Sequence, residues 1–466
     1  MAKKTSLLVI FLTVFIDLVG FGIVLPILPL YIKELGASGL IAGAIVASYS
    51  LMQAIFSPFW GGLSDRIGRR PVLLLSTAGA CISYSVFALG CINQSILLLL
   101  LSRVAAGICG ANLSVASAYI ADITPPEDRS KRMGLIGMAF GLGFILGPVL
   151  GALGMTYFGV SGPGWLAAGV CGFNLILAFF ILGESRKPDS DPAEPPPRLG
   201  QMRRVLSHPH LRGLIGVFFL ATFCFTCFES TFAVLFAGTK DSPGNYTFSN
   251  PINLMEGERM RSEIYDGLEI RKDEPIAITS KGDSIKASST GRIEQLENGG
   301  WVIDDTKTKA YWLMAFCGII GAIVQGGFIG PLVKAAGEKI LIISGLFFVG
   351  LSLSFIPYCN DKTGLPLLII VLGIFAIGSG VYRAPTFGLI SLNASDSQQG
   401  EVMGVTQSIG SLARIIGPLF ALGLMDIEPE LPYLICSGIA IITALFGFKF
   451  IGSTSNSTSP QNVDGK

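Results

Sequence analysis

Charged residues are scarce in this 466-residue chain. Asp, Glu, Lys and Arg together make up 14% of it, whereas hydrophobic residues make up 51%. Because a soluble globular domain carries roughly 25% charged residues, this chain has too little polar surface to face water on all sides. The formal net charge of +1 gives no reason to expect nucleic-acid binding.

Groups for catalysis or direct energy coupling are also few. The two histidines, His208 and His210, lie in a polar, Pro-rich segment, where their spacing alone is weak evidence for a metal site. The sequence has no glycine-rich phosphate-binding loop, which argues against direct drive by ATP. Cys224 and Cys227 lie in an apolar run, where cysteine more often packs than binds metal or reacts. We therefore expect no enzyme activity, no cofactor and no metal site.

Long apolar runs, by contrast, are abundant. A bilayer span requires about 20 mostly apolar residues, and the runs between polar breaks predict about twelve helices of this length. They lack the alternation of barrel strands, so the sequence predicts an all-α membrane protein. The first run exceeds the roughly 7–15 residues of a signal-peptide core, so no removable leader is expected. The predicted spans lie near residues 6–32, 38–60, 71–91, 95–121, 133–157, 163–183, 211–237, 309–333, 339–358, 364–391, 401–425 and 431–452.

Lys and Arg gather in the short loops on one side of these spans. The opposite side carries Lys33, Lys362 and little else in its short loops. By the positive-inside rule, the basic loops and both termini are expected in the cytoplasm, with the protein in the plasma (inner) membrane. The basic loop residues are Arg66, Arg69, Arg70, Arg129, Lys131, Arg132, Arg186 and Lys187.

Two stretches of the first part of the chain recur in the second part. "GLIGMAFGLGFILGPVLGALG" (134–154) is similar to the segment 270 residues later, and "GGLSDRIGRR" (61–70) to the segment 269 residues later. Such repeats are typical of secondary transporters, and they predict two pseudo-symmetric six-helix halves. The predicted parts are a first half (1–183), a cytoplasmic Pro-rich linker (184–210), a second half (211–453) and a cytoplasmic tail (454–466).

A polar insertion interrupts the second half at residues 238–309 on the non-cytoplasmic side. Short alternating pieces such as "EPIAITS" predict a small β-rich excursion. A tolerated surface insertion, a lid over the outer mouth and a partner-docking module all remain open. The tripeptide "NYT" (245–247) is an N-glycosylation sequon.

Three motifs resemble the major facilitator superfamily of transporters. The loop "GGLSDRIGRRP" (61–71) resembles its signature loop between helices two and three, and "LSRVAAGICGAN" (101–112) resembles its fourth-helix motif. "GFILGPVLG" (143–151) resembles the fifth-helix motif of its drug/proton antiporters, and the run 118–151 most resembles the tetracycline/proton antiporter branch. The residues that carry these motifs are Gly61, Arg66, Gly68, Arg70, Arg103, Gly143, Gly147, Pro148 and Gly151.

The resemblance implies roles for charged residues. Asp65, Arg69 and Asp122 would form a charge relay that holds an outward-open state; the alternative is a loop that only sets topology. Asp17 and Arg103 would couple transport to protons, because a chain without an intramembrane histidine needs a carboxylate as proton carrier. Asp17 could instead cap a helix at the lipid interface.

The fifth-helix motif and the remaining intramembrane polar groups have less definite roles. The fifth-helix glycines would seal one side against leak, or would serve helix packing alone. Glu229 is expected to line the mouth, to be structural or to carry a proton, and Arg383 and Arg414 to bind an anionic substrate group or a carboxylate partner. The candidate cavity residues are Gln53, Glu229, Gln325, Arg383, Gln407 and Arg414.

These observations predict a proton-coupled antiporter that exports small amphiphilic molecules or drugs and works as a monomer in the lipid bilayer. Its partners would be its small-molecule substrate and protons, with the proton gradient as driving force. The alternatives are a proton-coupled uptake carrier for a sugar or an organic anion, and a receptor or scaffold. Ser83 stands where tetracycline exporters carry an acid, which argues against tetracycline as the substrate.

Overall fold

The computed structural model describes most of the chain. Outside the described residues lie Arg186 and Lys187 of the predicted linker, the whole predicted tail (454–466), and the side chains of Arg129, Lys131 and Arg132. The described residues are 2–124, 129–185, 198–239, 242–252, 259–260, 267–271, 274–278, 284–286, 293–295, 301–393 and 399–450.

Long helices form nearly all of the described first part. Two expected spans are broken rather than continuous. The first breaks at residues 25–27, where Pro26 has no backbone N–H to donate, and the fourth tightens into a 3₁₀ turn, η1 (Gly110–Asn112). The helices are α1 (Ala2–Val24), α2 (Leu28–Glu34), α3 (Gly39–Ile67), α4 (Arg69–Ile92), α5 (Ile96–Cys109), α6 (Leu113–Ile123), α7 (Arg129–Phe158) and α8 (Gly162–Ile181).

The second part is built in the same way. Here two spans expected to be separate follow one another without a loop, because the π-helical turn η4 joins them and the chain changes direction within α12. Gly337 has φ +76° at that bend, a conformation that glycine adopts without steric cost. The elements are α9 (Arg198–Ser207), α10 (Pro209–Ala237), α11 (Thr306–Ile323), η4 (Val324–Phe328), α12 (Ile329–Phe355), η5 (Ile356–Tyr358), α13 (Leu365–Leu392), α14 (Gln399–Met425) and α15 (Leu431–Phe450).

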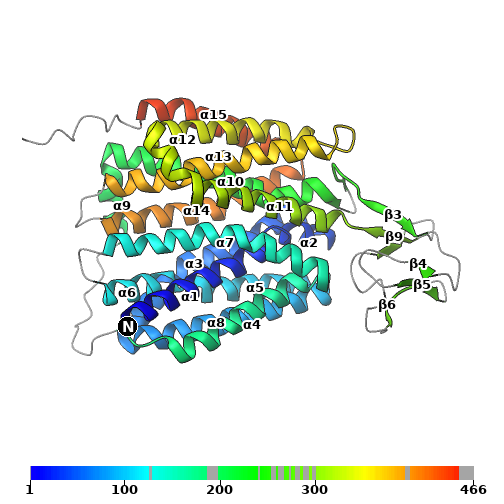
Figure 1. Cartoon of the computed structure of the whole chain (residues 1–466), viewed down its shortest axis with the longest axis horizontal. Helices are drawn as coiled ribbons and strands as arrows, with labels where there is room; N and C mark the ends of the chain where they lie inside the picture. Colours follow the sequence, from blue (N-terminus) through cyan, green and yellow to red (C-terminus); the bar gives the residue numbers. More distant parts are fainter. Residues whose placement is uncertain are drawn as a thin grey trace, which may run out of the picture.

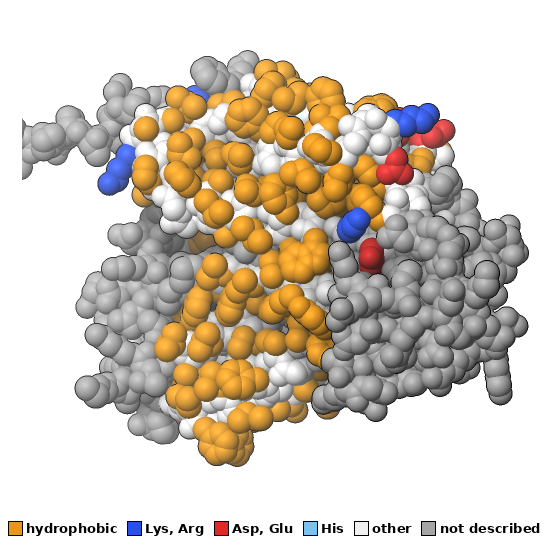
Figure 2. All heavy atoms as spheres, turned by 45° about the vertical axis from the view of Figure 1, so that its right-hand side comes forward, with side chains coloured by type: hydrophobic (Ala, Val, Ile, Leu, Met, Phe, Trp, Pro, Cys, Tyr) orange, Lys and Arg blue, Asp and Glu red, His pale blue; other side chains and the backbone are white. Residues whose placement is uncertain are grey.

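The helices have the length and composition of membrane spans. Within the described residues, nine segments are long and apolar enough to cross a bilayer, and one of them, Thr306–Tyr358, is 53 residues long. Apolar side chains cover the face of the bundle in Figure 2, over both parts of the chain, while charged side chains lie toward its ends. An apolar belt of this kind suits contact with lipid. The expected all-α membrane architecture is confirmed, whereas the count of twelve spans stays a prediction.

The insertion between α10 and α11 contains short antiparallel strands. The strands form a sheet of order β3-β9-β8, a second of order β4-β5-β6-β7, and the pair β1-β2. Figure 1 shows β3–β9 projecting from one end of the bundle, opposite the N-terminus. The strands are β1 (Gly238–Thr239), β2 (Ser242–Pro243), β3 (Ser249–Ile252), β4 (Arg259–Met260), β5 (Gly267–Arg271), β6 (Glu274–Ile278), β7 (Ser284–Lys286), β8 (Ile293–Gln295) and β9 (Trp301–Asp304).

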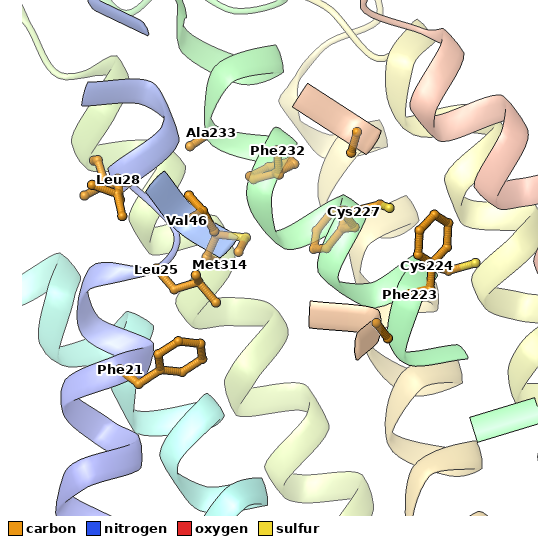
Figure 3. Close-up of a cluster of buried hydrophobic side chains, with 14 of the residues drawn as sticks. Phe21, Leu25, Leu28, Val46, Phe223, Cys224, Cys227, Phe232, Ala233 and Met314 are labelled. Atoms are coloured by element: carbon orange, nitrogen blue, oxygen red, sulfur yellow. The ribbon is translucent and has the colours of Figure 1, made fainter. Parts of the chain in front are cut away.

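The bundle consists of two groups of helices that meet along a long seam. In Figure 1, α1–α8 form the lower group and α10–α15 the upper group; we call them the first and second halves. One continuous apolar cluster crosses the seam, with Phe21 of α1, Leu25 directly after that helix, Val46 of α3, Phe232 of α10 and Met314 of α11 among its members (Figure 3). Burial of these side chains joins the halves into one body.

The start of the insertion is fastened to the second half. The Asn245 side-chain amide donates to the carbonyl oxygens of Pro357 at 2.8 Å and Cys359 at 2.9 Å. The Tyr246 ring is buried and stacks on Phe236 with 5.0 Å between ring centroids. Both amide hydrogens of Asn245 are therefore engaged, so the folded chain does not present this sequon for glycosylation.

Replacing Asn245 with Ala should destabilise the second half, because two carbonyl oxygens lose their donor. We expect Asn245→Ala to lower the free energy of unfolding by about 1–3 kcal/mol, seen as a lower Tm of the purified full chain in detergent. Thr247→Ala is the matched control, since it destroys the sequon but leaves both amide hydrogen bonds in place. A wild-type Tm for Asn245→Ala would contradict the anchoring role.

Candidate functional site

Ion pairs close the seam at the end of the bundle that carries the insertion, here called the insertion end. Lys33 Nζ lies 2.5 Å from Asp426 Oδ1, and Asp426 Oδ2 accepts from the backbone N–H of Gly39 at 2.5 Å. Beside this pair, Lys307 Nζ lies 2.9 Å from Glu34 Oε1. The neighbouring residues Lys33 and Glu34 of the first half thus hold two partners of opposite charge in the second half. Sequence reasoning missed these pairs, although adjacent opposite charges at a span end were a visible signal.

Close backbone contact reinforces this closure. A Cβ on Gly43 of α3 would lie 2.7 Å from the carbonyl oxygen of Pro418 on α14, and Gly39 is crowded against Leu422 of the same helix. The Tyr311 hydroxyl of α11 donates to the carbonyl oxygen of Ile23 at 3.2 Å. Only small residues allow helices to approach this closely, so the insertion end of the seam is shut in this conformation.

The fifth-helix motif packs on α1, as its small residues permit. A Cβ on Gly147 would lie 2.6 Å from Gly22 Cα, and one on Gly143 would lie 2.7 Å from Leu18 Cβ. Pro148 lies inside α7, directly after Gly147. Gly151 faces the Tyr311 ring of the other half, 2.8 Å from the position of a Cβ. The motif therefore serves helix packing, and its last glycine also lies at the closed seam.

A small central pocket lies between the halves. Arg414 is the expected cavity residue that lines it, together with hydroxyl groups from α3 and α10. Its volume of about 10 Å³ is near the minimum for one water molecule, so in this conformation the halves have closed on the centre as well. The lining residues are Phe21, Leu25, Val46, Ser50, Thr226, Ser230, Arg414 and Pro418.

Asp17 lies within the first half, one helical turn from Phe21 of the central pocket. Its Oδ2 accepts from Asn112 Nδ2 at 2.6 Å, and the same amide group donates to Ser76 Oγ at 2.6 Å. Its Oδ1 is buried and has no hydrogen-bond partner among the described residues. Asp17 is therefore a buried carboxylate oriented by an amide group, which argues against a helix cap at the lipid interface.

Arg103 is buried in the same half but is held by aromatic rings. Its side chain is only 2% exposed, and its guanidinium carbon lies 5.3 Å from the centroid of Tyr84 and 5.0 Å from that of Phe87. None of the ion pairs of the described residues joins it to Asp17. Cation–π contact of this kind stabilises a desolvated guanidinium group, so the two residues share a half without direct pairing.

The structure brings the three expected members of the charge relay together. Arg69 pairs with Asp65, and its Nε lies 3.2 Å from Asp122 Oδ2. Glu184, which sequence reasoning missed, accepts from the backbone N–H groups of Arg69 at 2.9 Å and Arg70 at 3.1 Å and so stabilises the start of α4. All of these residues belong to the first half, and their contacts coexist with a shut insertion end. The relay alone therefore does not keep that end open.

Other residues of the signature loop take separate positions. A Cβ on Gly68, which has φ +101°, would collide with the Glu184 carboxylate, and Gly61 lies beside Ser114. Arg70 Nη2 donates to the carbonyl oxygen of Phe179 at 2.7 Å, whereas Arg66 is exposed. The loop glycines thus make room for the charged groups around them.

The remaining cavity candidates do not line the central pocket. Gln53 Nε2 donates to the carbonyl oxygen of Gly110 at 2.9 Å, and Gln325 lies in the π-helical turn η4. Arg383 lies over the Phe225 ring, 4.4 Å from its centroid. Glu229 is 3% exposed on α10, and Gln407 is half-buried on α14.

Ser83 is buried too, and its Oγ donates to the carbonyl oxygen of Gly79 at 2.7 Å. No group of three or more His, Cys, Asp or Glu side chains suited to a metal occurs in the described part of the chain.

The chain is similar to known transporters over almost its whole length. A family model of the Major Facilitator Superfamily matches residues 10–251 and 302–465. The tetracycline resistance protein, class C, of Escherichia coli is 30% identical over 428 residues, which cover 90% of this chain and 89% of that protein. Multidrug resistance protein 2 of Bacillus subtilis (strain 168) is 24% identical over 446 residues and covers 94% of each chain. The crystal structure of the human organic anion transporter MFSD10 (TETRAN) is similar in fold, with a TM-score of 0.58 and 23% identity over 96% of this chain and 99% of that one.

Removing the Asp426 carboxylate should loosen the insertion end of the seam. In Asp426→Asn the ion pair to Lys33 is lost and the Gly39 N–H has a weaker acceptor, at a cost of about 1–2 kcal/mol. We expect amide hydrogen exchange over residues 39–46 and 418–426 to become roughly 5–30-fold faster, measured by mass spectrometry on the full chain in lipid nanodiscs.

Glu428→Gln on the same loop is the control, because Glu428 is in none of the ion pairs of the described residues. Unchanged exchange in Asp426→Asn, or equal acceleration in the control, would show that the Asp426 pair does not close the seam.

Proposed function

Because this chain belongs to the Major Facilitator Superfamily, we propose that it is a proton-driven antiporter that exports small amphiphilic molecules. Its family makes it a multi-pass membrane transporter of small molecules and not an enzyme. The observation that carries the proton coupling is Asp17, a buried carboxylate with one unpartnered oxygen beside the seam between the halves. A carboxyl group in that position can accept and release a proton as its surroundings change.

The direction of transport follows from the relatives and from the topology. The similar proteins of Escherichia coli and Bacillus subtilis are named for tetracycline and multidrug resistance, which supports export over uptake of a sugar or an organic anion. The positive loops support an orientation in which the end with Arg66, Arg69 and Arg70, and both termini, lie in the cytoplasm of a plasma-membrane protein. The insertion end then faces outward, and the described conformation is closed to the outside.

The transport cycle would alternate the open side of the seam. Closure at the insertion end depends on the ion pairs Lys33–Asp426 and Glu34–Lys307, so opening that end requires both to separate. The central pocket lined by Arg414 must widen to admit a substrate. Both halves of one chain enclose this pocket, so a monomer suffices, and the proton gradient takes the place of a cofactor.

Asp17→Asn should abolish proton exchange without unfolding the protein, because the amide fills the same space but cannot release a proton at neutral pH. In inverted vesicles loaded with a pH-sensitive dye, adding a transported compound from a panel of amphiphiles should release protons in wild type and not in Asp17→Asn. Asp17→Glu, which keeps the carboxyl group, is the control and should retain part of the signal. Proton release by Asp17→Asn at the wild-type rate would refute the coupling role.

Asp65→Asn should slow transport while the chain remains folded. Arg69 then keeps one carboxylate partner, Asp122. If the free-energy difference between the inward-open and outward-open conformations changes by about 1.4 kcal/mol, we expect a roughly tenfold lower transport rate. The measurement is export from intact cells, with Tm of the purified protein recorded alongside. Asp65→Glu is the charge-preserving control, and full export by Asp65→Asn would contradict a gating role for the relay.

A further inference from the structure

Glu229 is a buried carboxylate in the second half that the proposed mechanism leaves unused. It lies on α10, a helix apolar enough to span the membrane, and it is 3% exposed. Its Oε2 is buried with no hydrogen-bond partner among the described residues, and Glu229 takes part in none of the ion pairs that those residues form. Burying an ionised carboxylate in such a position costs much free energy unless an opposite charge compensates it, and binding a proton removes that cost.

Carboxylates with a structural role in this bundle are held differently. Asp426 accepts from a lysine and a backbone N–H, and Glu184 accepts from two backbone N–H groups. Glu34, Asp122 and Glu401 each pair with a basic side chain. Glu229 shares none of these features, so holding the fold together does not account for it.

Two arginines act on Glu229 from neighbouring helices. Arg383 on α13 and Arg414 on α14 interact with its carboxyl group electrostatically. The Arg383 guanidinium lies over the Phe225 ring, and Arg414 Nη2 donates to Ser411 Oγ at 3.0 Å. On α15 the Tyr433 hydroxyl contacts Thr231 at 3.0 Å. The two arginines, one of which (Arg414) lines the central pocket, therefore influence the charge on Glu229.

The helix that carries Glu229 corresponds to the helix that carries Asp17 in the other half. Phe21 of α1 and Leu25 directly after that helix, and Thr226 and Ser230 of α10, line the same pocket, so α1 and α10 occupy equivalent places, 205 residues apart in the sequence. By this equivalence Glu229 lies seven residues, or two helical turns, further toward the insertion end than Asp17. At 1.5 Å per residue the two positions are staggered by about 10 Å along the bundle.

Each half therefore contains the same combination of groups. In both, a buried acid has one unpartnered oxygen, and an arginine lies against aromatic side chains: Asp17 with the buried Arg103 in the first half, and Glu229 with the half-buried Arg383 in the second. The acids lie at different depths, one on the arginine-loop side of the central pocket and one at its level.

We propose that Glu229 is a second proton-binding group, so that each half of the transporter carries one exchangeable proton. In this step a hydronium ion transfers one proton to the Glu229 carboxylate: a hydronium O–H bond breaks, a carboxyl O–H bond forms and a water molecule is left. This inference rests on the proposed proton coupling but concerns a different residue and the other half. In the transport cycle, Asp17 and Glu229 would be loaded and emptied from opposite ends of the seam.

Infrared difference spectroscopy tests the proposal without a transported compound. The full chain in lipid nanodiscs is titrated between acid and alkaline pH, and the carbonyl stretching band of protonated carboxylic acids is followed. We expect Glu229→Gln to lose one component of this band and to keep the component that Asp17→Asn loses. Glu401→Gln is the matched control, because Glu401 is already paired with Arg204 at 3.6 Å and should leave both components unchanged.

The outcomes separate this proposal from the proposed function. A Glu229→Gln spectrum identical to wild type would overturn the second proton site, whether or not the vesicles exchange protons. If Glu229→Gln loses its carbonyl band component but the wild-type protein exports nothing, the result would support the second proton site and the antiport proposal would fail. If Glu229→Gln does not fold, Glu229→Asp decides: it keeps a carboxyl group, and its component should move in frequency and in titration midpoint, whereas an unmoved component would overturn the proposal.

Discussion

The cost of a buried, unpaired charge is the constraint on which this structure depends. Inside an apolar bundle every ionised group must find an opposite charge, a set of hydrogen-bond donors or an aromatic face, or it must be neutralised. Arg103 and Arg383 lie on rings, while Lys33, Asp426, Glu34 and Lys307 pair across the seam. Asp17 and Glu229 each have a buried oxygen without a hydrogen-bond partner and take part in none of the ion pairs of the described residues, and these are the acids that we propose as proton carriers.

The same constraint shapes the seam between the halves. Ion pairs join the two halves at the insertion end, whereas the Asp65–Arg69–Asp122 network at the other end lies within one half. That network is formed while the insertion end is shut. Glycines at the seam, such as Gly39 and Gly43, allow the helices to meet backbone to backbone, and larger residues there would hold the halves apart.

The two ends of the insertion make contacts with different halves of the bundle. Asn245 and Tyr246 fasten its beginning to the segment between α12 and α13, and Lys307 at its end pairs with Glu34 of the first half. Opening the seam at the insertion end would therefore break a contact made by Lys307, a residue just beyond the last strand, β9. The contact that Lys307 makes thus belongs to the set of interactions that keep the insertion end of the seam closed.

Much of the architecture was predictable from the chain alone. Apolar runs predicted the helical membrane protein, and the loop, fourth-helix and fifth-helix motifs indicated the superfamily. Both kinds of signal could be found in the sequence because the hydrophobicity of a segment and a short motif depend only on residues close together in the chain. The assembly of Asp65, Arg69 and Asp122 was also predictable from its motif. The breaks after Val24 and at Gly110, the engagement of Asn245 and the pairs across the seam were not. These depend on contacts between residues such as Lys33 and Asp426, nearly four hundred positions apart. The sequence by itself determined which groups are charged and which segments enter the membrane. Only the tertiary structure decided which charges find a partner, because partnership depends on distances that folding alone sets.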